Sequence, residues 1–454
     1  MGRVRVPASA YYGSQTQRAV ENFPSSGLMP PTVFIHALAR VKLHAARANT
    51  ELGRLSTDIG AAVESAAEEI LSGRLDDQFV VDLFQTGSGT STNMNMNEVI
   101  ASRANEILTG RRGGRTPVHP NDHVNLGQSS NDVIPTALHL AAVLGIEAQL
   151  RPALDALAGS LGDLSHRFRD LPKIGRTHLQ DAVPMTMGQV FGGYARQAEA
   201  GGERLEAVLP RLCELALGGT AVGTGINTHP AFAEKVIAGI RADTRIPFAR
   251  ARNPFEAQAA RDAAVETSGA LRTIAASMVK IANDLRWLAS GPRCGIGELR
   301  LPVLQPGSSI MPGKVNPVIP EAVIQIAYQV MGNDTTIMLA GQAGNFELNV
   351  TLPLISYNLL QSIQLLSLAA DQLKEKCLAG LEVDLTVTKG YIENSLALVT
   401  GFVPHLGYDN AAKIAKNAYD SGRSVRAVAR ESGLLDEATI EAVLGPAPSS
   451  QHRD

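Results

Sequence analysis

Apolar residues recur at three- and four-residue spacing along most of this chain, and that spacing predicts helices. Two helical regions are expected first, at 31–73 and from about 91 to 108. Several later stretches are apolar on more than one face, as expected for helices buried on all sides. The sequence therefore predicts an all-α fold around a bundle of five long helices, which packs against copies of itself. The five stretches run from residue 131 onward and over 188–217, 271–285, 321–339 and 352–366.

The two ends of the chain lack this long-helix pattern. Residues 1–30 are rich in Gly, Pro, Ser and Tyr, which favours an extended surface segment. Past residue 385 the pattern shortens to small helices around a turn at 422–424, and the Pro/Ser-rich tail 445–454 is typical of disorder. We expect three domains: a mainly helical one at 1–128, the long-helix bundle at 129–385 and a small helical one at 386–454.

Composition narrows the class of protein. A net charge of -3 over 454 residues implies no general attraction to nucleic acid or to anionic membranes. The cysteines, Cys213, Cys294 and Cys377, lie far apart without metal-ligand spacing, which fits a reducing cytoplasm. The first ten residues lack the apolar core of a signal peptide, and no uninterrupted apolar run reaches the length of a membrane span. We expect a cytoplasmic protein.

The richest chemical motif is the segment 307–317, which reads Gly-Ser-Ser-Ile-Met-Pro-Gly-Lys-Val-Asn-Pro. Two glycines and two prolines break any regular helix or strand, so this segment is a loop with special backbone angles. Its hydroxyls, its ammonium and its amide stand just before a helix, where free backbone N–H groups favour an anion. The alternative is a structural turn with a solvated lysine.

Three other polar segments could join this loop. Gly-Ser-Gly-Thr at 87–90 precedes a helix and could hold a carboxylate, although Thr90 could be only a helix cap. Residues 119–132 are unusually polar and offer donors at the next helix start; a metal site there lacks the expected ligand spacing. In 175–184, His178 is a natural proton-transfer group, although a lone histidine in a loop is usually structural.

These segments together resemble the fumarase/aspartase superfamily, in which 307–317 matches the signature loop over the active site. The resemblance runs from the first residues to about residue 430. Ser-Ser-Asn-Asp at 129–132, His178, and the segments 344–350 and 404–409 look most like the class II fumarate hydratases within it. The resemblance implies a three-domain fold, a homotetramer with a twenty-helix core, and active sites that each draw on three chains.

The implied activity is the reversible hydration of fumarate to (S)-malate in the citric acid cycle. Aspartate ammonia-lyase is the alternative enzyme, and a catalytically silent structural member of the superfamily is the alternative of another class. No metal or organic cofactor is expected, because the chain has no cysteine cluster and no nucleotide-binding Gly-rich motif. The expected partners are a small dicarboxylate and other copies of the chain, without nucleic acid or membrane.

The resemblance also implies roles for particular residues. Ser308 would take the C3 proton, His178 would handle a proton or the water, and Glu321 would tune His178. Lys314 would stabilise developing negative charge, as a fixed cation can. The substrate-binding residues would be Ser88, Gly89, Thr90, Ser129, Ser130, Asn131, Thr177, Ser309, Lys314, Val315 and Asn316, and a second dicarboxylate site would use His119, Pro120, Asn121 and Asp122.

The chain departs from the family pattern at a few positions. Val190 stands where a Glu is usual, Thr351-Leu352 replaces an aromatic-Lys pair, and Phe402-Val403 replaces Leu-Asn. Ser91-Thr92 leans toward the aspartases. The chains of the family usually begin earlier, so this short start is either genuine or marks an internal initiator. These differences bear on rate and stability more than on the reaction.

Overall fold

The computed structural model describes residues 2–23 and 25–445 and is almost entirely helical. The strands within this part of the chain form only two-stranded sheets, so the all-α prediction is confirmed. Contacts between residues divide the chain into two compact units, and each unit is assembled from separate stretches of the sequence. The first unit contains residues up to 152, 202–275 and 326–367, and the second contains 153–201, 276–325 and the residues from 368 on.

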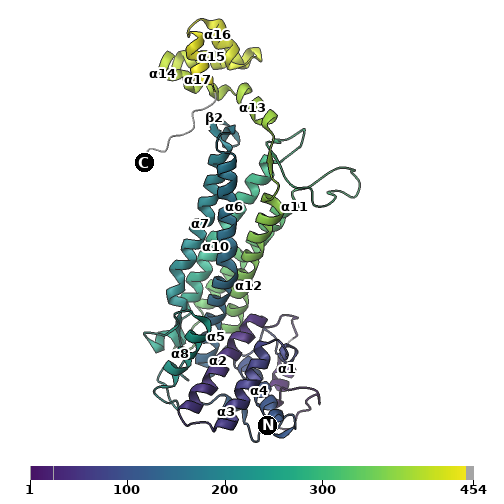
Figure 1. Cartoon of the computed structure of the whole chain (residues 1–454), viewed down its shortest axis with the longest axis vertical. Coiled ribbons are helices and arrows are strands. Elements are labelled where there is room, and N and C mark those ends of the chain that lie inside the picture. The colour runs from purple at the N-terminus through teal and green to yellow at the C-terminus, as the bar shows by residue number, and fades with distance from the viewer. Residues whose placement is uncertain (1, 24, 446–454) are drawn as a thin grey trace. The chain divides into compact units, whose positions relative to one another are not determined.

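The N-terminal helices of the first unit are shown in purple and blue in Figure 1. The two predicted helical regions are confirmed, the first as a pair of helices. The elements are α1 (Ser14–Asn22), α2 (Thr32–Glu51), α3 (Thr57–Leu71), η1 (Asp76–Gln78), α4 (Thr90–Thr109) and η2 (Pro120–Val124). Later stretches of the chain add α8 (Phe232–Thr244), α9 (Pro254–Ala259) and the parallel pair β3 (Glu214–Leu215) and β4 (Ala249–Arg250).

Helix α1 corrects the expectation of an extended N-terminal segment. The buried Glu98 carboxylate on α4 accepts hydrogen bonds from the backbone N–H groups of Gly13, Gln15 and Thr16. The same carboxylate accepts a hydrogen bond from the Thr16 hydroxyl. A negative charge at the N-terminus of a helix stabilises it, and here that charge comes from more than 80 residues away in the chain. Local composition could not reveal this contact.

The five long helices form where the apolar spacing predicts them. In the first unit, Ser268 on α10 (Asp262–Leu288) donates to Asp334 on α11 (Val318–Gly341). Asn333 on α11 donates to Ser362 on α12 (Leu352–Gln372). In the second unit, the Tyr194 hydroxyl of α7 (Met187–Leu212) donates to Asp284 of α10. The helices are α5 (Ser130–Gly145) continued by η3 (Ile146–Leu150) and α6 (Arg151–Arg167), α7 (Met187–Leu212), α10 (Asp262–Leu288), α11 (Val318–Gly341), and α12 (Leu352–Gln372) continued by η4 (Leu373–Leu378).

Two of these continuous helices, Ser130–Arg167 and Leu352–Leu378, are long and apolar enough to cross a membrane by length and composition alone. This modifies the sequence expectation, which considered only uninterrupted apolar runs. Most of each apolar window is buried inside the protein, 67% and 61% respectively. The core helices of a soluble protein meet the same criterion, so the two helices are weak evidence for a membrane.

The second unit carries the remaining strands and the C-terminal helices. The strands β1 (Pro172–Thr177) and β2 (Gln180–Thr186) form an antiparallel hairpin, and β5 (Leu299–Arg300) pairs with β6 (Glu382–Val383). As predicted, the C-terminal part has short helices and a turn at Gly422, where φ is +67°. The elements are α13 (Leu385–Asn394), η5 (Leu396–Phe402), α14 (Val403–Leu406), α15 (Tyr408–Ser421), α16 (Val425–Ser432) and α17 (Glu437–Leu444).

The C-terminal helices have an apolar core of their own. Phe402, Ile414, Val425 and Ile440 are buried together in it. Phe402 is completely buried, so this departure from the family pattern fills space in the core of the small helices. The expected disordered tail lies outside the described residues, apart from Gly445.

Candidate active site

The loop 85–90 packs against the segment 350–352. The Gly87 carbonyl accepts a hydrogen bond from Leu352 N–H at 2.9 Å, and a Cβ at residue 87 would overlap the Val350 carbonyl oxygen. Gly89 has φ of +75°, a left-handed conformation that glycine adopts without strain. The hydroxyl oxygens of Ser88 and Thr90 lie 2.8 Å apart, and α4 begins at Thr90. The loop therefore presents two hydroxyls at a helix N-terminus.

The segment 129–132 is built as a helix cap. Ser129 Oγ accepts a hydrogen bond from Asn131 N–H, and the Asp132 carboxylate accepts one from Ser129 N–H at 2.9 Å. The other oxygen of Asp132 accepts from the backbone N–H groups of Gly218 and Thr220, at 3.0 Å each. This fully buried carboxylate fixes the start of α5 against the loop 218–220.

The structure brings these two segments together. Asn93, one turn into α4, donates from Nδ2 to the Ser130 hydroxyl at 3.0 Å. A Cβ at Gly89 would lie 3.0 Å from the Ile134 side chain of α5, so the two helix starts are closely packed. The predicted substrate-binding residues Ser88, Gly89, Thr90, Ser129, Ser130 and Asn131 thus form one cluster in the first unit.

The expected second dicarboxylate site lies around η2. His119 Nδ1 accepts hydrogen bonds from the backbone N–H groups of Asn121 and Asp122, at 3.2 and 3.1 Å. The same Nδ1 also lies 3.2 Å from the Asp122 carboxylate. Asn121 and Asp122 are exposed, whereas Pro120 is buried. The site would offer an imidazole and an amide beside a carboxylate.

His178 lies in the tight turn between β1 and β2. Thr177 pairs with Gln180 across the hairpin, which leaves His178 and Leu179 as the turn residues, with φ of +56° and +61°. Positive φ at both turn residues is typical of the mirror-image turns that suit hairpins, but it is uncommon for residues with a side chain. Thr177 and His178 are both exposed. Strain of this kind gathers at functional sites.

The loop 307–317 closes on itself. Gly307 N–H donates to the Lys314 carbonyl at 2.7 Å, and Asn316 Nδ2 donates to the Gly307 carbonyl at 2.7 Å. A Cβ at residue 307 would lie 2.6 Å from the Lys314 carbonyl oxygen, so only glycine fits there. Ser308 Oγ accepts hydrogen bonds from the N–H groups of Ile310 and Met311, at 3.2 and 3.0 Å. Donors aimed at that oxygen favour its negatively charged form.

The remaining loop residues project outward. Ser309, Lys314 and Val315 are exposed, and Ile310 is 84% exposed, which is unusual for a large apolar side chain. Glu321 lies in the first turn of α11, as predicted. Within the described part of a single chain, no hydrogen bond joins Glu321 to His178, so that pair stays a prediction.

Sequence reasoning missed a buried group in the second unit. The Glu298 side chain is completely buried, and its Oε1 lies 2.9 Å from Nη1 of Arg176, the residue before Thr177. Lys173 Nζ lies 3.6 Å from Oε2, within ion-pair distance. The Arg176 guanidinium also stacks over the Tyr391 ring. Glu298 lies more than 120 residues after Lys173 and Arg176 in the sequence, so the local pattern gives no signal of this arrangement.

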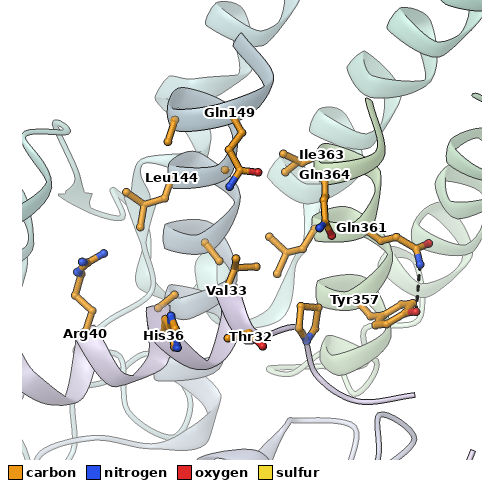
Figure 2. A pocket seen from close by; sticks show the side chains of 16 residues that line it. Thr32, Val33, His36, Arg40, Leu144, Gln149, Tyr357, Gln361, Ile363 and Gln364 are labelled. Carbon is orange, nitrogen blue, oxygen red and sulfur yellow. Dashed lines mark hydrogen bonds between the residues drawn. The ribbon is translucent and has the colours of Figure 1, made fainter. Parts of the chain in front are cut away.

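A cavity of about 490 Å³ lies elsewhere in the first unit, between the start of α2, the end of α5 and α12. Apolar side chains such as Val33, Leu144 and Ile363 line it together with Gln149, Gln361 and Gln364 (Figure 2). His36 and Arg40 on its wall already pair with Asp76 and Asp243. None of the predicted site residues lines this cavity.

The described part of the chain contains no cluster of side chains that could coordinate a metal ion. No group of three or more His, Cys, Asp or Glu residues is arranged there to hold one. The candidate groups are instead hydroxyls, amides, backbone N–H groups, one imidazole and one ammonium. Such a set can hold a small carboxylate dianion and move protons.

Two family models match the chain. One, described as a lyase, covers residues 2–332, and another, described as the fumarase C C-terminus, covers residues 398–448. The first match contains every predicted site residue. The second covers most of the small C-terminal helices.

Relatives resemble the chain over nearly its whole length. Proteins named class II fumarate hydratase from Nitrosomonas europaea and Neisseria meningitidis are 54% and 52% identical, over 98% of this chain and 96% and 97% of theirs. The crystal structure of a class II fumarase from Schistosoma mansoni has a TM-score of 0.95 and 40% identity, covering 98% of this chain and 96% of that one. A fumarate lyase:delta crystallin from Brucella melitensis, bound to cobalt, has a TM-score of 0.93 and 48% identity, covering 97% and 96%. The chain therefore belongs to the lyase family and, within it, to the class II fumarate hydratases.

Proposed function

We propose that this protein catalyses the reversible hydration of fumarate to (S)-malate, the fumarase step of the citric acid cycle. The observation that carries the proposal is the 54% identity to a class II fumarate hydratase over 98% of the chain. The sequence similarity extends over the whole alignment rather than over one domain or one motif. The aspartate ammonia-lyase and silent-protein alternatives have no comparable support among these relatives.

For the reaction itself we propose that Ser308 removes the C3 proton of malate while His178 serves the departing hydroxyl. The C3 hydrogen leaves as a proton on the Ser308 oxygen, its electron pair forms the double bond, and the hydroxyl leaves as water with a proton from His178. A free serine is a weak base and must be activated. The N–H groups of Ile310 and Met311, which donate to Ser308 Oγ, support this role.

We assign substrate binding to the cluster of residues 88–90 and 129–131 and to the loop 307–317. Thr90, Ser130 and Asn131 offer donors at adjoining helix starts, and Lys314 and Asn316 offer a cation and an amide on the loop. Fixed donors and a cation that meet the two carboxylates would lower the barrier to removing the C3 proton, because they stabilise the added negative charge that spreads onto the neighbouring carboxylate. Ser309, Val315 and Thr177 complete the proposed binding set, and Glu321 is proposed to tune His178.

We also propose a homotetramer in which each active site combines residues from three chains. The large exposed apolar side chains on the long helices support burial against other copies: Trp287 is 53% exposed, Tyr328 58%, Leu339 52% and Leu368 47%. The domain boundaries near 128 and 385, the second dicarboxylate site at residues 119–122, the independence from cofactors and a cytoplasmic location stay predictions.

Ultraviolet absorbance of fumarate tests the activity directly. The purified protein is incubated with (S)-malate and, separately, with aspartate. A rise in absorbance with malate alone supports the proposal. A rise with aspartate and none with malate would make the protein an ammonia-lyase, and no rise with either would favour the silent alternative.

A further inference from the structure

Lys42, in the middle of α2, is completely buried in the first unit. An ammonium is almost never buried unless it is paired with a negative charge. Within the described ranges 2–23 and 25–445, no carboxylate lies within ion-pair distance of it. Its Nζ donates instead to two neutral oxygens, Asn125 Oδ1 and Gln128 Oε1, each at 3.0 Å.

The hydrogen bonds continue from the ammonium to a proposed substrate-binding residue. Asn125 Oδ1 also accepts from Nδ2 of Asn93 and of Asn97, at 3.2 Å each. Asn93 Nδ2 in turn donates to the Ser130 hydroxyl at 3.0 Å. An ammonium can only donate, so it forces the Asn125 oxygen inward, and that oxygen attracts the Asn93 amide toward Ser130.

The Lys42 ammonium has two hydrogen-bond acceptors in this network, but two amide oxygens of the network have no donor. The Oδ1 atoms of Asn93 and Asn97 are buried without a hydrogen-bond partner in the described chain. Buried networks that serve only stability are normally satisfied throughout, because an unpaired buried acceptor is costly. One of these two unpaired acceptors belongs to Asn93, the residue that holds the Ser130 hydroxyl.

Charge around Lys42 is sparse. The charged group that attracts it electrostatically is the buried Asp132 carboxylate of α5. That carboxylate already accepts hydrogen bonds from three backbone N–H groups. Burial lowers the pKa of Lys42 to about 7, opposed by Asp132. Other charges on the neighbouring helices pair elsewhere: Glu98 with residues 13–16, Asp243 with Arg40, Glu64 and Glu68 with Arg47, and His119 with Asp122.

We propose that Lys42 is a positioning residue for dicarboxylate recognition: its buried ammonium fixes Asn125 and Asn93, orients the Ser130 hydroxyl and supplies positive charge near the substrate. The inference rests on the proposed function, since it takes a four-carbon dicarboxylate as the ligand of Ser130. The α2 helix carries no motif residue of the site, so Lys42 extends the site to a helix that sequence reasoning treated as core.

Calorimetric titration with succinate, a saturated four-carbon dicarboxylate, tests the proposal without requiring turnover. Lys42→Met keeps all but the last atom of the side chain's length and removes its charge, and it should weaken succinate binding by roughly ten- to a hundredfold, the loss expected for charge-assisted hydrogen bonds. The matched control is Lys235→Met, which removes an exposed lysine paired with Glu51 and should bind like the wild type. Equal binding by Lys42→Met and the wild type would overturn the inference.

A second variant keeps the test decisive if Lys42→Met does not fold. Succinate affinity of the wild type should fall as pH rises through about 7, because the ammonium loses its charge. Asn125→Asp places a carboxylate beside Nζ and should move that step to higher pH. The inference would be contradicted if succinate affinity of the wild type did not fall near pH 7, or if the fall occurred at the same pH in Asn125→Asp. Failure of the proposed function would look different: a wild type that neither hydrates fumarate nor binds succinate.

Discussion

Arg176 and the completely buried Glu298 are joined by a hydrogen-bonded ion pair, with Nη1 of one 2.9 Å from Oε1 of the other. Arg176 belongs to β1 and immediately precedes Thr177 and His178 in the hairpin. Glu298 immediately precedes β5, after which the chain leads to the Ser308 loop. One buried carboxylate therefore ties the hairpin that carries the proposed proton-transfer histidine to the start of the segment that carries the proposed base.

Glu298→Gln should destabilise the second unit and lower activity. It leaves Arg176 and Lys173 without their counter-charge in a buried place, which typically costs about 3–5 kcal/mol. Thermal unfolding and malate turnover measure the two effects. The matched control is Arg300→Gln on the neighbouring strand, whose pair with Asp384 is solvent-exposed at the arginine, and it should change little. If both variants behaved alike, Glu298 would have no special role.

Ser308→Ala should lower kcat by roughly a hundredfold or more while changing KM much less, the pattern for losing an interaction made in the transition state. The loop should keep its closure, because the contacts of Gly307 with Lys314 and Asn316 do not involve the Ser308 hydroxyl. Steady-state kinetics on the assembled protein provides the measurement. A near-normal kcat would assign the base role to another group.

Mixed assemblies test whether active sites are shared between chains. Ser308→Ala and His178→Asn should each be nearly inactive alone. If a site takes Ser308 from one chain and His178 from another, mixed tetramers contain some intact sites and should regain activity well above either parent. Refolding the two variants together and separately, then assaying malate turnover, gives the comparison. No gain on mixing would place both residues in the same chain of each site.

The stability of the protein should depend on pH through Lys42. Its pKa is about 7 in the folded state and near 10.5 when exposed, so between these values the unfolded chain binds more protons. The wild type should therefore gain stability relative to Lys42→Met as pH rises from 7 toward 10, by about 1.4 kcal/mol per pH unit. Chemical unfolding of both proteins at several pH values measures this difference. A constant difference would mean that Lys42 does not titrate in this range.

The sequence predicted the fold well where apolar spacing carried the information. The bundle stripes, including Leu271 to Leu285 and Leu352 to Leu366, became α10 and α12, and the short C-terminal helices formed as expected. That Ser88–Thr90 and Ser129–Asn131 serve one site was implied by the resemblance, because a position at a helix start does not by itself bring two motifs together. The motif roles of Ser308 and His178 came from the resemblance rather than from spacing.

Other features depend on contacts between distant residues, which local pattern cannot show. Helix α1 forms on a carboxylate from α4, and the hairpin around His178 depends on strand pairing that continues past Pro184. Lys42 reads as one polar position within an apolar helix, and its burial becomes visible only with Asn125 and Gln128 in place. Thr351, a departure from the family pattern, stands just before α12, and its hydroxyl donates to the carbonyl of Ala340 near the end of α11.

Hydration of fumarate in D₂O, followed by NMR, tests the central claim most directly. With Ser308 and His178 acting on opposite faces of the substrate, the product should be (S)-malate with a single deuterium at C3, added anti to the hydroxyl. One deuterated diastereomer, formed only when the protein is present, is the predicted result. Absence of malate would contradict the proposed activity, and a syn product or a mixture of both C3 diastereomers would contradict the proposed placement of the two groups.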